Sequence, residues 1–349
     1  MRIAIATSQA PFLSGGAEFL ASNLKSALIH AGHRAEIVSM PFMDTPLDMI
    51  EDHIVAARLL DINASWAGET DLCIGLKFPA YFMPHKNKVM WILHQYRAAY
   101  DLFDTDFSSL KNDIIGNKIK EMVTNADNRY LQESKRIYTI AANVAKRMGR
   151  YNGIKAQPLY HPCPDMDKFF LGDYEDYILM PSRINITKRQ HLAIEAMRHT
   201  KRDIKLFIVG GADHIFEQNR LTDKIKEYHL GNKVKYLGAV SQEEKFNLYA
   251  NARAVLFIPY DEDYGYITLE AMSASKAVIT TSDSGGPLEF VADTKTGIVA
   301  SPNDKSIAEA IDTIASSSKL AQNMGIAANK HIKDMNISWA NVVKELTKR

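Results

Sequence analysis

Two cations and two carboxylates stand at spacings that could serve chemistry on a phosphorylated ligand. Arg183 and Lys188 are five residues apart, after a predicted strand and at the start of a predicted helix. An Arg offers a bidentate fork and a Lys a point charge, so the two could grip a diphosphate. Taken alone, such a pair is also typical of solvated surface charges. Glu262 and Glu270 are eight residues apart with a turn between them, so each carboxylate could hydrogen-bond a different pair of hydroxyl groups on a ligand.

The segment around Glu262 runs from a predicted strand through an acidic loop into a predicted helix. Gly265 lies between Tyr264 and Tyr266 and allows a sharp turn there. The helix start that follows offers free amides and a positive dipole to a phosphate. A capped helix on an acidic loop would explain Gly265 but not both glutamates.

Other predicted strands also end at glycine turns or polar residues. Gly15 and Gly16 lie between the first strand and the first helix, where backbone amides attract an anion, although G-x-G-x-x-G is absent there. Gly210 ends another strand, and 284–287 is a further strand-to-helix turn. Local geometry alone explains the Gly15–Gly16 turn equally well, and it explains the other two turns better than a binding site does. His94 follows a strand and could hydrogen-bond a sugar hydroxyl, although a lone histidine is more often structural.

These residues must be positioned by a regular alternation of strands and amphipathic helices, which favours parallel sheets covered on both faces. A helix is predicted at 17–31, and strands at 2–7, 35–40, 72–76, 89–93 and 137–140. After the proline-rich 158–164, helices are predicted at 189–197, 216–229, 243–251, 266–274 and through the tail from 305, with strands at 177–181, 205–209, 233–237, 254–258, 277–281 and 297–300. Two α/β halves imply a cleft, with ligands at the carboxyl ends of strands.

Composition limits the function classes. The chain has 349 residues, which suggests about two domains, and its net charge of +1 argues against a nucleic-acid partner. Cys73 and Cys163 cannot make a disulfide framework or a four-cysteine zinc site. We expect a cytoplasmic protein, because no apolar run approaches the roughly 18 residues that span a bilayer. The segment 134–164 holds six basic residues and no acidic one, which predicts either weak contact with an anionic membrane or a solvated face.

The pattern Arg183-x4-Lys188 followed by Glu262-x7-Glu270 resembles the retaining nucleotide-sugar glycosyltransferases of family 4, also called glycosyl transferases group 1. The order of the motifs fits along most of the chain. The resemblance implies the α/β fold called GT-B, in which two Rossmann-like parallel-sheet domains face each other across a cleft. The implied parts are an acceptor-binding domain, a nucleotide-sugar-binding domain and a last helix that crosses back to the first domain, at 1–165, 166–330 and 331–349.

The resemblance also implies roles for single residues. The cations would stabilise the leaving diphosphate, the first glutamate would hold the donor sugar, and the second would hold the ribose hydroxyls. Tyr96 and Arg97 would contact the acceptor, although packing would explain them equally well. The implied catalytic residues are Arg183, Lys188, Glu262 and His94. The implied donor-binding residues are Gly15, Gly16, Gly210, Val240, Tyr264, Gly265, Tyr266, Ile267, Thr268 and Glu270.

Three positions depart from the family pattern. Tyr264 stands where the family often has Phe, Ile267 where it often has Pro, and Arg189 where it usually has Gly. These changes leave the cations and helix start in place, so they bear on the identity of the donor sugar rather than on binding of the diphosphate.

The expected activity is transfer of a hexose from a UDP- or GDP-sugar to a hydroxyl of a glycan, glycolipid or small-molecule acceptor, with retention. The segments 104–106 and 261–263 match the metal-binding pattern D-x-D, but Arg183 and Lys188 already supply positive charge, so no metal or other cofactor is expected. The alternatives are a GT-B-fold sugar-nucleotide epimerase or hydrolase, a nicotinamide-dependent oxidoreductase, which the missing G-x-G-x-x-G disfavours, and a nucleotide-sugar-binding protein without catalysis.

Overall fold

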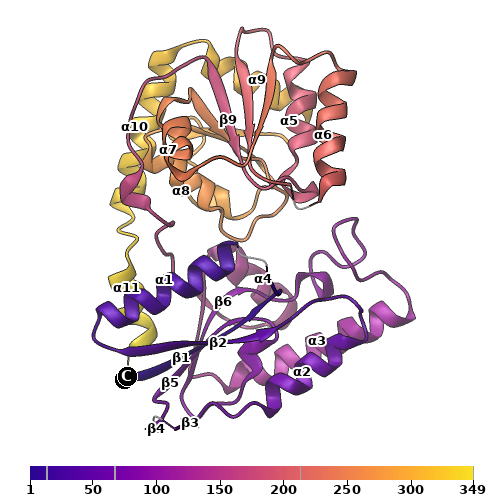
Figure 1. The fold of residues 1–349 in the computed structure, drawn as a ribbon, viewed down its shortest axis with the longest axis vertical. Coiled ribbons are helices and arrows are strands. Elements are labelled where there is room, and N and C mark those ends of the chain that lie inside the picture. Colours follow the sequence, from indigo (N-terminus) through magenta and orange to yellow (C-terminus); the bar gives the residue numbers. More distant parts are fainter. Residues whose placement is uncertain (13–14, 67, 213, 349) are drawn as a thin grey trace. The chain divides into compact units, whose positions relative to one another are not determined.

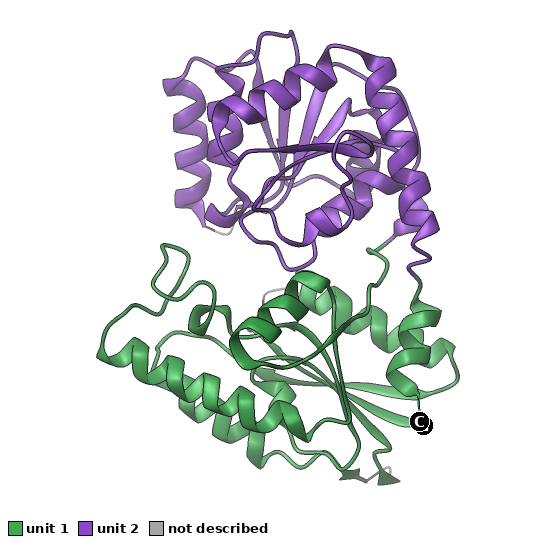
Figure 2. Ribbon diagram, turned by 180° about the vertical axis from the view of Figure 1, so that it is seen from behind, with its two compact units in different colours: residues 1–164, 338–349 green, residues 165–337 purple. Residues whose placement is uncertain are grey.

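The computed structural model describes residues 1–12, 15–66, 68–212 and 214–348. They form two compact units, which Figures 1 and 2 show as ribbons. Unit 1 consists of Met1–Pro164 together with Ser338–Arg349, and unit 2 of Asp165–Ile337. The end of the chain therefore belongs to the same unit as its beginning.

Unit 1 is built on a six-stranded parallel sheet in the order β2-β1-β5-β6-β7-β8. Strands β5 and β6 are almost continuously apolar and buried, as expected where helices cover both faces of a sheet. The strands of this unit are β1 (Arg2–Gln9), β2 (Arg34–Pro41), β5 (Leu72–Lys77), β6 (Lys88–His94), β7 (Arg136–Thr139) and β8 (Gln157–Pro158), with the small antiparallel pair β3 (Ala64–Ser65) and β4 (Gly68–Glu69).

Helices cover this sheet, and the last helix of the chain is among them. Helix α1 packs against α11, and α2 packs against α3. Trp339 of α11 lies edge-on to Trp91 of β6, with ring centroids 6.1 Å apart, and 5.7 Å from the ring of His161. The helices of unit 1 are α1 (Gly16–His30), α2 (Met49–Leu59), α3 (Ile114–Tyr130), α4 (Ala142–Asn152) and α11 (Trp339–Thr347), with the 3-10 turns η1 (Ala80–Phe82), η2 (Arg97–Ala99) and η3 (Leu131–Glu133).

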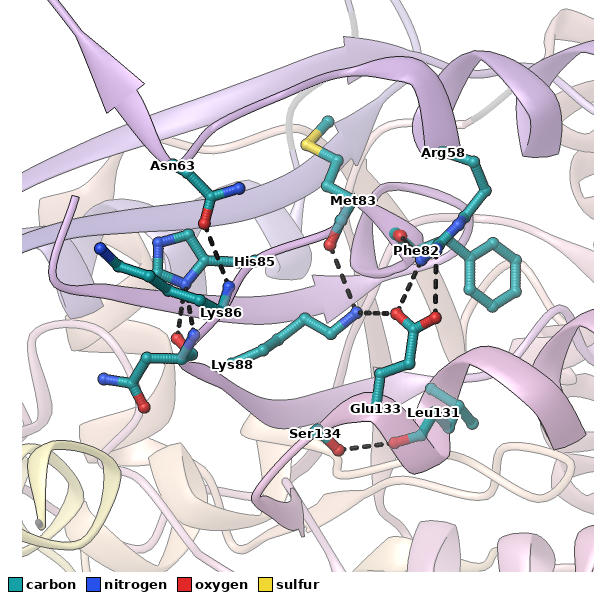
Figure 3. Close-up of polar contacts among 11 residues, drawn as sticks. Arg58, Asn63, Phe82, Met83, His85, Lys86, Lys88, Leu131, Glu133 and Ser134 are labelled. Atoms are coloured by element: carbon teal, nitrogen blue, oxygen red, sulfur yellow. Dashed lines mark hydrogen bonds and ion pairs between the residues drawn. The ribbon is translucent and has the colours of Figure 1, made fainter. Parts of the chain in front are cut away.

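An ionic cluster around the buried Lys88 lies at the amino-terminal edge of this sheet (Figure 3). Lys88 begins β6 with a side chain that is 0% exposed, and its Nζ lies 3.4 Å from Oε2 of Glu133. Arg58 of α2 binds both carboxylate oxygens of Glu133, at 2.7 and 3.0 Å. Burial lowers the pKa of Lys88 against the attraction of Glu133. Because ligands of parallel sheets bind at the opposite edge, this cluster has a structural role, joining α2 and η3 to the sheet.

Unit 2 contains the second six-stranded parallel sheet, in the order β11-β10-β9-β12-β13-β14. Helix α5 packs against α6 and α9, and α8 packs against α10 (Figure 1). The strands are β9 (Tyr177–Pro181), β10 (Lys205–Val209), β11 (Val234–Gly238), β12 (Ala254–Leu256), β13 (Val278–Thr281) and β14 (Gly297–Ala300). The helices are α5 (Gln190–Met197), α6 (Ile215–Glu227), α7 (Gln242–Asn251), α8 (Tyr266–Ser273), α9 (Asp304–Ala315) and α10 (Ser318–Asp334), with the 3-10 turns η4 (Met166–Lys168), η5 (Ile186–Lys188) and η6 (Gly286–Glu289).

The predicted elements of unit 2 match the observed ones closely. The strands predicted at 177–181, 205–209 and 297–300 are observed with those bounds. The strand predicted at 254–258 ends earlier, at Leu256, because the chain leaves the sheet there to form the loop that carries Glu262. In the part of the chain that the structure describes, no helix combines the length and apolar character needed to cross a membrane.

Candidate functional site

The predicted residues of unit 2 lie on segments that leave the carboxyl ends of its strands. Strand β9 leads to Arg183 and Lys188, β10 ends just before Gly210, β11 is followed by Val240, and β12 leads through Glu262 to α8. Because all these strands are parallel, the segments meet at one edge of the sheet, where ligands of α/β sheets bind. The structure therefore brings this part of the predicted set together.

Lys188 and Glu262 form an ion pair that joins two of these loops. The Nζ atom of Lys188 donates to Oε2 of Glu262. The two side chains are 16% and 25% exposed, so the pair is partly shielded yet reachable by a ligand. The ammonium also lies 5.7 Å from the ring centroid of Phe257. Because the ammonium offsets the charge of the carboxylate, an anionic ligand can approach Glu262 without net repulsion.

Polar side chains fix the loop that carries the two cations. Oδ1 of Asn185 accepts hydrogen bonds from the backbone N–H of Lys188, at 3.2 Å, and from the hydroxyl of Thr187, at 2.8 Å. The buried Gln190 donates through Nε2 to the carbonyl oxygen of Arg183, at 2.9 Å. Asparagine is a favoured cap because its short side chain reaches such N–H groups. Arg183 itself is exposed at the surface of this loop.

Backbone hydrogen bonds connect the loops that follow β9, β12 and β13. The N–H of Tyr260 donates to the carbonyl oxygen of Thr187 at 2.8 Å. The N–H of Glu262 donates to Ser284 at 2.9 Å, and the N–H of Gly286 donates back to Glu262 at 2.7 Å. Glu262 is therefore held by its backbone on one side and by Lys188 on the other, which limits the positions of its carboxylate.

Gly265, which directly precedes α8, has a backbone conformation that only glycine adopts readily. Its φ is 89°, and a Cβ atom would lie 2.9 Å from a ring carbon of Phe257. The first N–H groups of a helix lack partners within it, although that of Thr268 donates to the Gly265 carbonyl oxygen at 3.0 Å. Of the two amides predicted to contact a phosphate, Ile267 thus fits better than Thr268. The buried Thr268 hydroxyl has no hydrogen-bond partner among the described residues.

The two tyrosines beside Gly265 are packed against each other. Their rings meet edge-on with centroids 5.8 Å apart, and the buried Tyr264 also meets Phe290 edge-on at 5.4 Å. The ring of Tyr264 therefore packs inside unit 2 and stabilises the loop that carries Glu262. This placement leaves the backbone, rather than the ring, as the part of Tyr264 that faces the predicted donor sugar.

Glu270 projects from α8 toward α7, and two α7 side chains bind it. Lys245 places Nζ 3.0 Å from Oε1, and the Tyr249 hydroxyl donates to Oε2 at 2.5 Å. Glu270 is buried, with 9% of the residue exposed, and its carboxylate accepts these two hydrogen bonds. Each carboxylate oxygen can still accept from a ligand hydroxyl. Sequence reasoning missed Lys245 and Tyr249; their spacing of four on α7 was the one available signal.

Gly210 and Val240 lie at the same edge. Gly210 has a φ of 138°, and a Cβ atom there would lie 2.0 Å from the carbonyl oxygen of Ser182. Close packing of two strand ends is thus enough to require this glycine. Val240 is partly buried and directly precedes Ser241, whose hydroxyl caps α7 by accepting from the N–H of Glu244 at 3.1 Å.

The other predicted residues belong to unit 1. The N–H of Gly15 donates to Oε2 of Glu18 at 2.8 Å, and Gly16 begins α1. His94 ends β6 with Nδ1 2.7 Å from the carbonyl oxygen of Gln95. Because a carbonyl only accepts, this contact assigns the proton of a neutral ring to Nδ1 and leaves Nε2 as an acceptor.

Tyr96 and Arg97 are engaged in packing contacts. The Tyr96 ring stacks on Phe78 with centroids 5.3 Å apart, and its hydroxyl lies 3.2 Å from Oγ of Ser109. Arg97 binds Asp101 through two nitrogens, at 2.9 and 2.5 Å. These contacts favour a structural role for both side chains over the predicted contact with an acceptor.

The basic segment 134–164 does not form one patch of six cations. Arg147 is buried, with Nε 3.3 Å from Oδ1 of Asp101, and Arg136 donates to the carbonyl oxygen of Lys348, directly after α11. The cations of this segment that are exposed are Lys135, Lys146, Arg150 and Lys155.

Among the described residues there is no group of three or more His, Cys, Asp or Glu side chains arranged to hold a metal ion.

Comparisons with known proteins agree with this architecture. Residues 165–331, which lie in unit 2, match the family model for Glycosyl transferases group 1. The alpha-1,3/1,6-mannosyltransferase ALG2 of Dictyostelium discoideum is 36% identical over 139 residues, which cover 38% of this chain and 33% of that protein. The chain thus matches about a third of the length of this relative.

Solved structures resemble the whole chain. Sucrose-phosphate synthase from Thermosynechococcus elongatus superposes with a TM-score of 0.78 at 16% identity, over 99% of this chain and 97% of that one. Anabaena Alr3699/HepE in complex with UDP-glucose gives a TM-score of 0.73 at 16% identity, over 100% and 98% of the two chains. At this identity the likeness concerns the fold, and it confirms the predicted GT-B fold class.

Proposed function

We propose that this chain is a glycosyltransferase that moves a hexose from a UDP- or GDP-sugar to a hydroxyl of a glycan, glycolipid or small-molecule acceptor. The observation that carries the proposal is the Lys188–Glu262 ion pair beside the start of α8, at the carboxyl edge of unit 2. This edge belongs to the segment that matches the Glycosyl transferases group 1 model. The UDP-glucose complex of Anabaena Alr3699/HepE, which shares the fold, supports a nucleotide-sugar donor.

The diphosphate of the donor would be bound by positive groups of unit 2. As the bond between the sugar and the diphosphate breaks, negative charge grows on the β-phosphate. Arg183, Lys188 and the Ile267 amide at the start of α8 would stabilise that charge, because fixed donors need no reorganisation during the reaction. These groups supply the charge that a divalent cation would otherwise bring, so the proposal requires no metal.

The two glutamates and His94 would hold hydroxyl groups. Glu262, neutralised by Lys188, would accept hydrogen bonds from the donor sugar, and Glu270 would accept them from the ribose. His94 of unit 1 would offer Nε2 to a hydroxyl of the transferred sugar. The acceptor hydroxyl would attack from the side of the leaving group, and its proton would pass to the departing phosphate. This course retains the anomeric configuration.

Unit 1 would bind the acceptor, and its exposed cations would provide weak contact with anionic membranes from the cytoplasmic side. Lys146 and Arg150 are exposed on α4, four residues apart and so on one face of the helix. Sedimentation with vesicles checks this part. We expect more binding to anionic than to neutral vesicles at low salt, and equal binding to both would contradict it.

Donor turnover with and without acceptor tests the function. The protein is incubated with UDP-glucose or GDP-mannose, alone and with a panel of methyl glycosides and a lipid extract, and release of nucleoside diphosphate is measured. Release that rises strongly with an acceptor, together with a glycosylated product, supports a transferase. Release that is equal with and without acceptor would indicate a hydrolase. Binding of the donor without turnover under any condition would indicate a nucleotide-sugar-binding protein.

A further inference from the structure

Arg189, the residue after Lys188, adopts a backbone conformation that disfavours its side chain. Its φ and ψ are 57° and 36°, in the left-handed region. Glycine adopts this region freely, whereas other L-residues clash there between Cβ and the following carbonyl oxygen. An arginine at such a position is strained, and it persists where surrounding contacts compensate for the strain.

The side chain of Arg189 makes those contacts. Its two terminal nitrogens bind the two carboxylate oxygens of Asp283 at 2.9 and 2.7 Å, the bidentate geometry that a guanidinium favours. The guanidinium carbon also lies 5.0 Å from the ring centroid of Tyr260, within range of a cation–π interaction. Burial raises the pKa of Asp283, but hydrogen bonds from Arg189 and Thr281, together with the charge of Arg189, outweigh this effect and hold the pKa below its ordinary value.

These contacts join three separate loops. Arg189 belongs to the loop after β9, Tyr260 to the loop after β12, and Asp283 to the loop after β13. The backbone reinforces the connection, since the N–H of Asp261 donates to the carbonyl oxygen of Asp283 at 2.9 Å. Lys188 and Glu262 are the groups held by the first two of these loops.

We propose that Arg189 is a positioning residue, which fixes the loops so that Lys188 and Glu262 hold the geometry that binds the diphosphate of the donor. The inference rests on the proposed function, because only there do Lys188 and Glu262 act on a nucleotide-sugar. It assigns a role to a residue that the usual family pattern replaces by glycine. A lysine at 189 would keep the charge but could not bind both oxygens of Asp283 as a fork does.

The test compares binding of UDP and GDP by isothermal titration, for the full chain and its variants. Arg189→Gly removes the bridge and relieves the backbone strain, so the fold should keep its thermal stability. We expect its dissociation constant for the preferred diphosphate to rise about tenfold or more, and that of Arg189→Lys to lie between. In the double variant Arg189→Asp with Asp283→Arg, aspartate tolerates the left-handed region and the pair re-forms with exchanged partners. We expect its affinity to return to within about threefold of wild type.

Two results would overturn the inference: an Arg189→Gly variant that binds as wild type does, or a loss that the exchanged pair does not recover. A purely stabilising role would lower the unfolding temperature without changing the affinity. If Arg189→Gly does not fold, Asp283→Asn breaks the same bridge without touching the backbone of 189 and takes its place. A wild-type chain that binds neither diphosphate would instead refute the proposed function, together with the inference.

Discussion

Nζ of Lys188 donates to Oε2 of Glu262, although 74 residues separate the two in the chain. The contact joins two loops of unit 2: the loop that follows β9 and the loop that leads from β12 into α8. It places a cation beside a carboxylate that can accept hydrogen bonds from hydroxyl groups, close in the chain to the start of α8. A nucleotide-sugar needs this combination, because it carries a diphosphate directly linked to a sugar.

Removal of Lys188 and removal of Glu262 should have different effects on the binding and turnover of the donor. Lys188→Met leaves a carboxylate without its counter-ion beside the diphosphate, so we expect the dissociation constant for the nucleoside diphosphate to rise at least about tenfold, or about 1.4 kcal/mol. Glu262→Gln removes the carboxylate but keeps the cation, so diphosphate binding should be retained while turnover of the sugar donor falls.

Calorimetric titration and donor turnover measure these two effects. Lys205→Met is the matched control, because Lys205 is an exposed lysine at the opposite end of strand β10 in the same sheet. Equal loss of diphosphate binding in Lys188→Met and Lys205→Met would show that the effect is one of overall charge and not of this pair.

The last helix should be essential for the stability of unit 1. Trp339→Ala removes a partly buried ring that packs on Trp91 and His161, so we expect a loss of about 2 kcal/mol in the free energy of unfolding, less than the about 3–5 kcal/mol of a fully buried ring. Denaturant unfolding followed by fluorescence of the remaining tryptophans measures it. Lys344→Ala, at an exposed position of α11, is the control and should change little. A Trp339→Ala variant as stable as this control would contradict the packing described for α11.

Asp127 should make stability depend on pH. It is buried in unit 1 and accepts hydrogen bonds from Tyr81, Tyr100 and Gln95 at 2.6–2.8 Å. Burial raises its pKa to about 6 from an ordinary value of 3.8, against the opposing effect of those hydrogen bonds. Between these values the folded state binds more protons than the unfolded state, so this contribution to stability is present at low pH and is lost as pH rises from about 4 to 6.

Asp127→Asn removes this titration. As pH rises from about 4 to 6, the unfolding free energy of wild type should therefore fall relative to that of Asp127→Asn. Urea unfolding at several pH values measures it, with Asp106→Asn, an exposed carboxylate of the same unit, as the control. Parallel stability profiles of wild type and Asp127→Asn across this window would refute the assignment.

Metal removal tests the source of positive charge at the site. If Arg183, Lys188 and the α8 amides stabilise the leaving diphosphate, treatment with EDTA should leave the rate of donor turnover unchanged. Complete loss of turnover after EDTA treatment, with recovery on addition of Mn²⁺ or Mg²⁺, would show that a divalent cation shares this task.

The sequence predicts the strands of both sheets except the two-residue edge strand β8, because buried parallel strands are continuous apolar runs bounded by turns. It also predicts which residues follow the carboxyl ends, and so which side chains of unit 2 meet. It could not reveal Arg189–Asp283, since the two are 94 residues apart and Asp283 lies in no recognised motif. Tyr96 is a case in which the sequence pattern suggested a binding role for a side chain that is packed inside its unit. An aromatic residue at a strand end suggests a sugar platform, but its ring is stacked on Phe78 inside unit 1.

The central claim is that unit 2 binds a nucleoside diphosphate at the carboxyl edge of its sheet, and thermal unfolding tests it most directly. Wild type and Glu270→Ala are unfolded with UDP, GDP, ADP, dTDP or NAD⁺, each in the presence of EDTA. A ligand at 100 times its dissociation constant adds about 2.7 kcal/mol of stability. We predict that UDP or GDP stabilises wild type and that Glu270→Ala loses most of the shift. Stabilisation by NAD⁺ alone, or by no diphosphate, would contradict the claim.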